Sequence, residues 1–166
     1  MLILITGGCK NGKSDFAQKV CMELAEKRKK YYLATLHVRD AEDEKRVESH
    51  LKSRAEMDFE TIEATEKLPA LDKPVYLQSL FLLDSLTLLL ANRMFLFDGK
   101  NFCFEKDSAQ ELCKEIINFA SKVYCLVVVS DFIYSDCLSY TYESECYRSS
   151  LAFIEKELVK VCNSYI

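Results

Sequence analysis

Long uninterrupted apolar runs are missing from this sequence. The longest apolar stretch, residues 77–91, is broken by Gln78, Asp84 and Thr87, and it falls short of the roughly 18 apolar residues that a transmembrane helix needs. Residues 1–6 carry no basic side chain and lead directly into glycines, so they predict a first strand rather than a secretory signal peptide. We therefore expect a cytoplasmic protein without a membrane span.

An excess of positive charge is also missing. The chain has 22 lysine and arginine residues against 26 aspartate and glutamate residues, which gives a formal net charge of −4. Proteins that bind nucleic acid through its phosphates usually carry a surplus of cations, so we expect no nucleic-acid partner. Internal repeats and low-complexity linkers are absent as well, and 49% of the residues are hydrophobic. This composition predicts one folded domain over residues 1–166.

Cysteine is abundant, but the spacings that build a disulfide framework or a zinc site are lacking. The eight cysteines are scattered along the chain, and no two of them have the Cys-x-x-Cys spacing. We expect reduced thiols on apolar faces of helices and strands, as in a cytoplasmic protein. Cys9 differs because it lies in a glycine-rich segment before a predicted helix, where a thiolate would be stabilised. A small filling residue is the simpler interpretation of Cys9.

Glycine is scarce, and its positions are informative. The chain has four glycines, and three of them fall in the segment Gly-Gly-Cys-Lys-Asn-Gly-Lys-Ser between a predicted strand and a predicted helix. This segment matches the phosphate-loop motif G-x-x-x-x-G-K-[ST], in which backbone N–H groups at a helix N-terminus converge on phosphate oxygens. We predict that a nucleoside triphosphate contacts the residues of this loop, Gly7, Gly8, Cys9, Lys10, Asn11, Gly12, Lys13 and Ser14. Lys13 would neutralise the β- and γ-phosphates during catalysis, and Ser14 would bind Mg²⁺.

Strands and helices are predicted to alternate along the chain. Apolar runs predict strands, and helical periodicity, such as that of Phe16, Val20 and Leu24, predicts helices. The predicted strands are 1–6, 31–36, 59–64, 80–84 and 123–129, and the predicted helices are 13–27, 40–54, 86–97, 105–121 and 143–162. This order implies an α/β fold of the P-loop NTPase type, RecA-like, with a mostly parallel sheet and helices on both of its faces.

Two alternatives stay open around Asp98 and Gly99. This pair would suit the end of the helix 86–97, and it would equally suit a hairpin turn between residues 94–97 and 102–104.

Asp84 ends the apolar run of the fourth predicted strand, where a second ligand for Mg²⁺ is expected in a triphosphate site. An aspartate at this position is equally suited to cap the helix that begins near Leu86. The two roles are compatible, and we predict Ser14 and Asp84 as the protein ligands of the metal.

His50 lies four residues after Arg46 and four residues before Arg54, so a helix would place the three side chains on one face. The two guanidinium groups would disfavour protonation of the imidazole and bind a polyphosphate. Such an imidazole can attack the α-phosphorus of a nucleotide and form a covalent phosphoramidate. A solvated surface histidine is the alternative. We expect His37 to be structural or to make a minor contact.

Several segments share a pattern with one known family. They are 3–14 with the double-glycine loop, Tyr32-Leu-Ala-Thr35, the group Asp40, Glu42, Arg46, Val47, His50 and Arg54, then Phe59, 61–63, 84–92, and Tyr147-Arg148 with Leu151. Together these segments resemble the bifunctional adenosylcobinamide kinase and adenosylcobinamide-phosphate guanylyltransferase family of cobalamin biosynthesis.

The resemblance implies two reactions. GTP or ATP would phosphorylate the aminopropanol hydroxyl of adenosylcobinamide, and GTP would then guanylylate His50, which passes GMP to the new phosphate. The resemblance also implies Mg²⁺, a corrinoid substrate and a homotrimer. It extends the predicted nucleotide contacts to Thr35, Arg46, Arg54, Glu63 and Asp84.

The chain departs from the family pattern in three places. After the strand ending at Ser130, the family's Asn-Glu-Val-Gly is replaced by Asp131-Phe-Ile-Tyr134, and an Asn-Gln pair is replaced by Glu155-Lys156. The family's final strand is expected to begin only about where this sequence ends, at Ile166. Two alternatives therefore remain, a P-loop protein that binds nucleotide without completing the pathway, and another small-molecule P-loop kinase.

Overall fold

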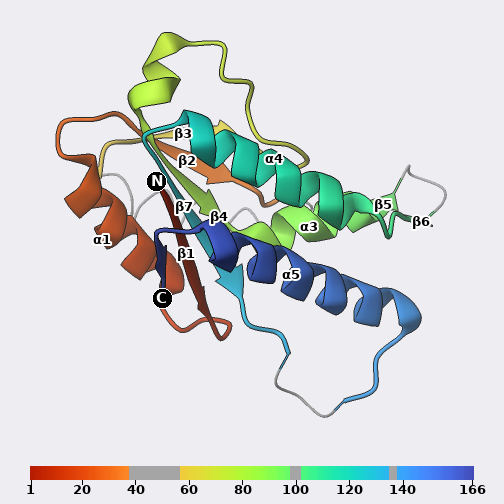
Figure 1. The fold of residues 1–166 in the computed structure, drawn as a ribbon. Coiled ribbons are helices and arrows are strands. Elements are labelled where there is room, and N and C mark those ends of the chain that lie inside the picture. Colours follow the sequence, from red (N-terminus) through yellow and green to blue (C-terminus); the bar gives the residue numbers. More distant parts are fainter. Residues whose placement is uncertain (38–56, 98–101, 135–137) are drawn as a thin grey trace.

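A parallel sheet forms the centre of the fold (Figure 1). The computed structural model describes residues 1–37, 57–97, 102–134 and 138–166, and within these residues six strands form this sheet, in the order β3-β2-β4-β7-β1-β8. Every neighbouring pair in it is parallel, which confirms the predicted mostly parallel sheet. The strands are β1 (Leu2–Gly7), β2 (Lys30–Ala34), β3 (Phe59–Glu63), β4 (Leu80–Asp84), β7 (Cys125–Asp131) and β8 (Ser164–Tyr165).

Helices cover both faces of the sheet, as the sequence predicts (Figure 1). Helix α1 packs on one face, and helices α3, α4 and α5 pack on the other. A short 3₁₀ helix, η1 (Pro74–Gln78), precedes β4. In the part of the chain that the structure describes, the α-helices are α1 (Lys13–Ala25), α3 (Leu86–Met94), α4 (Ser108–Lys122) and α5 (Tyr142–Val161).

The central strands are buried on both faces. In β7, Leu126 and Val128 pack into the core beneath α3, α4 and α5, whereas Cys125, Val127 and Val129 pack beneath α1. All five side chains are at most 1% exposed. Burial on both faces explains why this strand is a continuous apolar run in the sequence rather than an alternating one.

Helix α1 is confirmed as amphipathic, with Val20 and Leu24 partly buried against the core, but the predicted apolar position Phe16 is not part of that core. Phe16 is 44% exposed, whereas Ala17, Cys21 and Ala25 are buried against the sheet. These three residues recur every four positions and carry small side chains, so they allow a close approach of the helix to the sheet. Gln18 is buried beside them.

Helix α3 is shorter than predicted, because the segment after Met94 forms a hairpin. Strand β5 (Phe95–Phe97) pairs antiparallel with β6 (Phe102–Phe104), so a helix to Phe97 is wrong and the strand pairing of the hairpin alternative is confirmed. The turn predicted at Asp98 and Gly99 lies outside the described residues. The directly opposed rings of Phe95 and Phe104 have centroids 5.4 Å apart, the kind of cross-strand aromatic contact that stabilises a hairpin.

Helix α3 is buried within this chain. Its residues Leu86, Leu89, Leu90 and Met94 are inaccessible to solvent, in one core with α4 and α5. Its apolar character therefore needs no partner chain to explain it, and the trimer stays a prediction from the resemblance.

The C-terminal residues form a sheet edge, which corrects the expectation that the final strand would begin only at the end of this sequence. Strand β8 pairs with β1. The N–H of Thr6 donates to the carbonyl of Ile166 at 2.8 Å, the N–H of Ile166 donates to the carbonyl of Leu4 at 3.0 Å, and the N–H of Leu2 donates to the Asn163 side chain at 2.8 Å.

The other boundaries differ from the predicted ones by up to three residues. The largest single shift is the start of α4 at Ser108 instead of residue 105, and the shift that matters for function is the end of β7 at Asp131 instead of residue 129. The helix predicted over 40–54 lies outside the described residues.

The cysteines that the structure describes are free thiols. Cys21, Cys113 and Cys125 are buried, and burial raises the pKa of Cys125 to about 11, so this thiol stays protonated. Cys9 is exposed in the loop after β1, and Cys103 is exposed in β6. Over the ranges given above, no helix combines the length and the apolar character needed to cross a bilayer.

Candidate functional site

The loop between β1 and α1 is exposed and leads into the N-terminus of α1. Gly12 precedes α1 with a φ of 85°, a left-handed conformation that favours glycine, and no side chain caps the helix at this position. The Asn11 Oδ1 atom accepts a hydrogen bond from the N–H of Lys13 at 3.2 Å. An exposed loop that leads into an uncapped helix N-terminus presents N–H donors and partial positive charge, which suits an anion such as a phosphate.

The beginning of the loop is tightly packed. A Cβ atom added at Gly7 would lie 2.5 Å from the Asn11 amide nitrogen and 3.3 Å from the Lys13 Cδ atom. A side chain at this position would therefore displace the end of the Asn11 side chain and crowd Lys13. Gly8, Cys9 and the loop tip are exposed.

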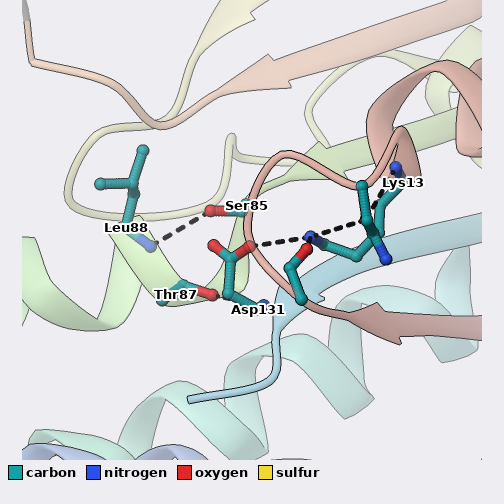
Figure 2. Close-up of polar contacts among 7 residues, drawn as sticks. Lys13, Ser85, Thr87, Leu88 and Asp131 are labelled. Carbon is teal, nitrogen blue, oxygen red and sulfur yellow. Dashed lines mark hydrogen bonds and ion pairs between the residues drawn. The ribbon is translucent and has the colours of Figure 1, made fainter.

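Lys13, the lysine of the phosphate-loop motif and the first residue of α1, is 9% exposed. Its Nζ atom donates to the Gly8 carbonyl at 2.6 Å and to Asn11 Oδ1 at 3.2 Å, and it forms an ion pair with Asp131 Oδ1 at 2.9 Å. Figure 2 shows the Asp131 carboxylate facing the Lys13 amine. The loop therefore holds a nearly buried cation where the motif predicts one.

Asp131 reaches Lys13 because β7 is the neighbour of β1, and Asp131 is in register with Gly7 at the ends of the two strands. Its backbone N–H donates to the Thr87 Oγ1 atom at 2.8 Å (Figure 2). The Thr87 carbonyl accepts from the Tyr147 hydroxyl at 2.8 Å. Burial, and to a lesser extent the negative charge of Asp131, raises the pKa of Tyr147, so this hydroxyl remains a donor.

Asp84 ends β4, which is the neighbour of β7. Its Oδ2 atom accepts a hydrogen bond from the Tyr32 hydroxyl at 3.0 Å. Alternate residues of β4, Leu80 and Leu82, pack beneath α1, so Asp84 is directed to the same face of the sheet as α1 and the loop.

Thr35 supports Asp84 from the opposite face. It is fully buried, its hydroxyl donates to the Asp84 carbonyl at 3.0 Å, and the same hydroxyl accepts from the Ser85 N–H at 2.8 Å. Asn92 of α3 donates to the carbonyls of Thr35 and Thr65, at 2.8 and 2.7 Å. In this structure the Thr35 hydroxyl is hydrogen-bonded to the backbone at Asp84 and Ser85, and the predicted contact of Thr35 with nucleotide stays a prediction.

We expect Thr35→Val to lower the free energy of unfolding by about 1–3 kcal/mol, because it leaves a buried N–H and a buried carbonyl without their partner. Urea denaturation measures the change. The matched control is Thr61→Val on the exposed edge strand β3, which should change the stability by no more than about 0.5 kcal/mol. Equal stabilities of the Thr35→Val and Thr61→Val proteins would contradict the role of the Thr35 hydroxyl.

A cluster of polar side chains, Glu155, Ser130 and Tyr134, lies on the face of the sheet that α5 covers. Glu155 is partly buried close to the hydroxyl groups of Ser130 and Tyr134. Burial raises the pKa of Glu155, and the hydroxyl groups offset part of this rise. Ser130 pairs in register with Thr6, so this group lies on the opposite face of the sheet from Lys13.

The remaining predicted site residues lie elsewhere. Glu63 ends the edge strand β3 and is exposed, four strands from β1, which corresponds to about 19 Å at ordinary strand spacing. Cys9 and Lys10 are exposed in the loop. His50, Arg46 and Arg54 lie outside the described residues, so their position relative to the loop remains a prediction.

Three residues at the site were not among the sequence predictions. They are Asp131, which contacts Lys13, Thr87, which holds the Asp131 backbone, and Tyr32, which contacts Asp84. Knowledge of the strand order could have revealed Asp131, because β7 is the neighbour of β1 and its C-terminal end lies beside the loop that follows β1. The sequence does not carry that order.

The residues present fit Mg²⁺ when it arrives with a triphosphate. Ser14 lies in the first turn of α1 and is partly exposed, and Asp84 offers a carboxylate on the same face of the sheet. Mg²⁺ usually takes one or two protein oxygens and completes its coordination with substrate phosphates and water. The described residues contain no group of three or more metal-ligating side chains.

The fold as a whole is similar to that of a solved structure. The crystal structure of flagellar accessory protein FlaH from Methanocaldococcus jannaschii matches with a TM-score of 0.51 and 15% identity, over 94% of this chain and 67% of that chain. At this identity the likeness concerns the fold alone. Together with the loop and the strand order, it defines a P-loop NTPase-type α/β fold.

The sequence of this chain also matches the model of a protein family. The model of the family described as cobinamide kinase / cobinamide phosphate guanyltransferase matches residues 3–166. This chain therefore belongs to the cobinamide kinase and cobinamide phosphate guanyltransferase family, whose activities are nucleotide-dependent transfers in cobalamin biosynthesis. No curated protein gives a significant match.

Proposed function

We propose that this protein phosphorylates adenosylcobinamide and then transfers GMP to the product through a covalent intermediate on His50. The observation that supports the first half most strongly is Lys13, a nearly buried cation at the N-terminus of α1 that forms an ion pair with the strand-end carboxylate of Asp131. The match to the family over 3–166 supports the identity of the acceptor.

In the kinase reaction, the substrate hydroxyl attacks the γ-phosphorus of GTP or ATP, loses its proton, and the nucleoside diphosphate leaves. Lys13 would stabilise the negative charge that spreads over the phosphoryl oxygens, and the N–H groups at the start of α1 would hold the remaining phosphates. Mg²⁺, held by Ser14 and Asp84, would neutralise phosphate charge when the nucleotide is bound.

In the guanylyltransferase reaction, an imidazole nitrogen of His50 attacks the α-phosphorus of GTP and pyrophosphate leaves. The phosphate of the corrinoid then attacks the same phosphorus, and the bond from phosphorus to nitrogen breaks. Arg46 and Arg54 would bind the phosphate oxygens during both steps. We further propose a homo-oligomer, a trimer by resemblance, in the cytoplasm.

Incubation with GTP labelled at the α-phosphate tests the covalent step. We expect acid-labile label on the wild-type protein and no label on His50→Asn, because asparagine cannot form the phosphoramidate. The chain has two histidines, so His37→Asn is the matched control and should keep the label.

Label that survives in His50→Asn, or that disappears only in His37→Asn, contradicts the proposed carrier. Transfer of the γ-phosphate to adenosylcobinamide tests the kinase half separately. Labelling without this transfer would restrict the protein to guanylyltransferase activity, and nucleotide binding without either reaction would favour a binding protein that does not complete the pathway.

A further inference from the structure

The Lys13 amine makes as many contacts with the protein as it has hydrogens. A lysine ammonium group has three N–H donors. In this structure three oxygens lie within reach of Nζ, the Gly8 carbonyl at 2.6 Å, Asn11 Oδ1 at 3.2 Å and Asp131 Oδ1 at 2.9 Å. A phosphate oxygen that binds Lys13 must therefore take the place of at least one of these oxygens.

Asp131 is the acceptor that an incoming phosphate displaces most readily. The Gly8 carbonyl and the Asn11 side chain are neutral and belong to the same loop as Lys13, whereas Asp131 carries a charge of the same sign as the phosphate and comes from β7. Like charges at such short range repel each other strongly in a site that is mostly shielded from water. The Asp131 side chain is 29% exposed, so it has room to leave, whereas that of Lys13 is 8% exposed.

The backbone of Asp131 is held by hydrogen bonds on both sides of the residue, and its side chain is held by the ion pair with Lys13. Thr87 of α3 accepts the Asp131 N–H, Tyr147 of α5 donates to the Thr87 carbonyl, and the Phe132 N–H donates to the Gly7 carbonyl at 2.8 Å. The carboxylate therefore starts from a defined position beside the loop in every molecule.

We propose that Asp131 is a positioning residue that holds Lys13 in the nucleotide-free loop and is displaced from Lys13 when a polyphosphate binds. This inference rests on the proposed binding of nucleoside triphosphates at the loop. Its consequence is a preference for ligands that bring enough negative charge to replace the carboxylate. The contact lowers the affinity for a triphosphate, and it keeps the Lys13 side chain extended in the empty loop.

The test is binding of inorganic tripolyphosphate, GTP and GMP by the wild-type protein and by Asp131→Asn, measured by calorimetry in the presence of Mg²⁺. We expect Asp131→Asn to bind tripolyphosphate and GTP about three- to tenfold more tightly, because no ion pair has to break and no carboxylate repels the ligand. The affinity for GMP should change by less than about twofold. Thermal unfolding confirms that the variant is folded.

Two further variants separate the Lys13 contact from a general effect of charge. Asp15→Asn removes an equal charge from the exposed first turn of α1, and it should leave all three affinities within about twofold of the wild type. In a Lys13→Met background, adding Asp131→Asn should tighten tripolyphosphate binding by a smaller factor than in the wild type, because the ion pair is already gone and only the repulsion between the carboxylate and the ligand is removed.

Unchanged or weaker tripolyphosphate binding by Asp131→Asn overturns the inference, and so does an equal gain in the Lys13→Met background or in Asp15→Asn. Failure of the proposed function has a different signature. If no label reaches His50 while Asp131→Asn still tightens tripolyphosphate binding, the guanylyl transfer is wrong and the role of Asp131 stands.

Discussion

Lys13→Met should weaken GTP binding by about 10- to 100-fold, the equivalent of losing one or more charge-assisted hydrogen bonds. It should lower the rate of phosphoryl transfer by a further factor of about 100 to 1000, because the cation stabilises charge that develops in the transition state. The physical reason is the near burial of Lys13, which leaves little water to replace the missing charge. Calorimetry measures the first effect, and single-turnover kinetics measure the second.

The matched control for this prediction is Lys19→Met, which removes the same charge from an exposed position of α1 beyond the loop. It should leave both the affinity and the rate within about twofold of the wild type. If Lys13→Met bound GTP as tightly as Lys19→Met, the loop would not be the phosphate site and the proposed function would lose its main support.

Phe81→Ala should lower the free energy of unfolding by about 3–5 kcal/mol, the largest stability effect that we expect in this chain. Phe81 lies in β4 and is fully buried. Its ring stacks on Tyr31 with centroids 5.0 Å apart and meets Phe119 of α4 edge-on at 5.0 Å. Removing the ring leaves a cavity between the sheet and α4 that the surrounding rings cannot fill.

Chemical denaturation followed by circular dichroism measures this change. Phe153→Ala is the matched control, because Phe153 lies on α5 and is 39% exposed. We expect it to cost about 1 kcal/mol or less, since only part of its ring leaves water on folding. Similar losses for the two variants would show that Phe81 is not packed in the way that the structure describes.

The sequence predicts the fold well for strands that are buried on both faces, because this burial requires an uninterrupted apolar run. Strands such as β7 and β4 are apolar without interruption because helices cover both of their faces, and few arrangements besides a buried parallel strand produce such a short apolar run. The exposed Phe16 could not be predicted, since the apolar period in α1 is satisfied equally well by Ala17, Cys21 and Ala25. The choice between these faces depends on the distance from helix to sheet, which only the assembled core determines.

The candidate site could be predicted in part. The loop from Gly7 to Ser14 follows from local chemistry, because glycines and a lysine at this spacing serve few other purposes. The contact between Lys13 and Asp131 joins residues that are far apart in the chain, and it depends on β7 lying beside β1. The predicted end of β7 at residue 129 also left Asp131 in a loop, although the strand continues through it.

The pairing of β8 with β1 has a consequence for the behaviour of the protein in solution. Without Ser164–Tyr165 and the backbone of Ile166, the strand that carries the phosphate loop would present a row of unsatisfied amides and carbonyls to other molecules. Such a row is a template for the addition of foreign strands and for aggregation. A two-residue strand offers much less of this template than the six-residue β1 that it covers.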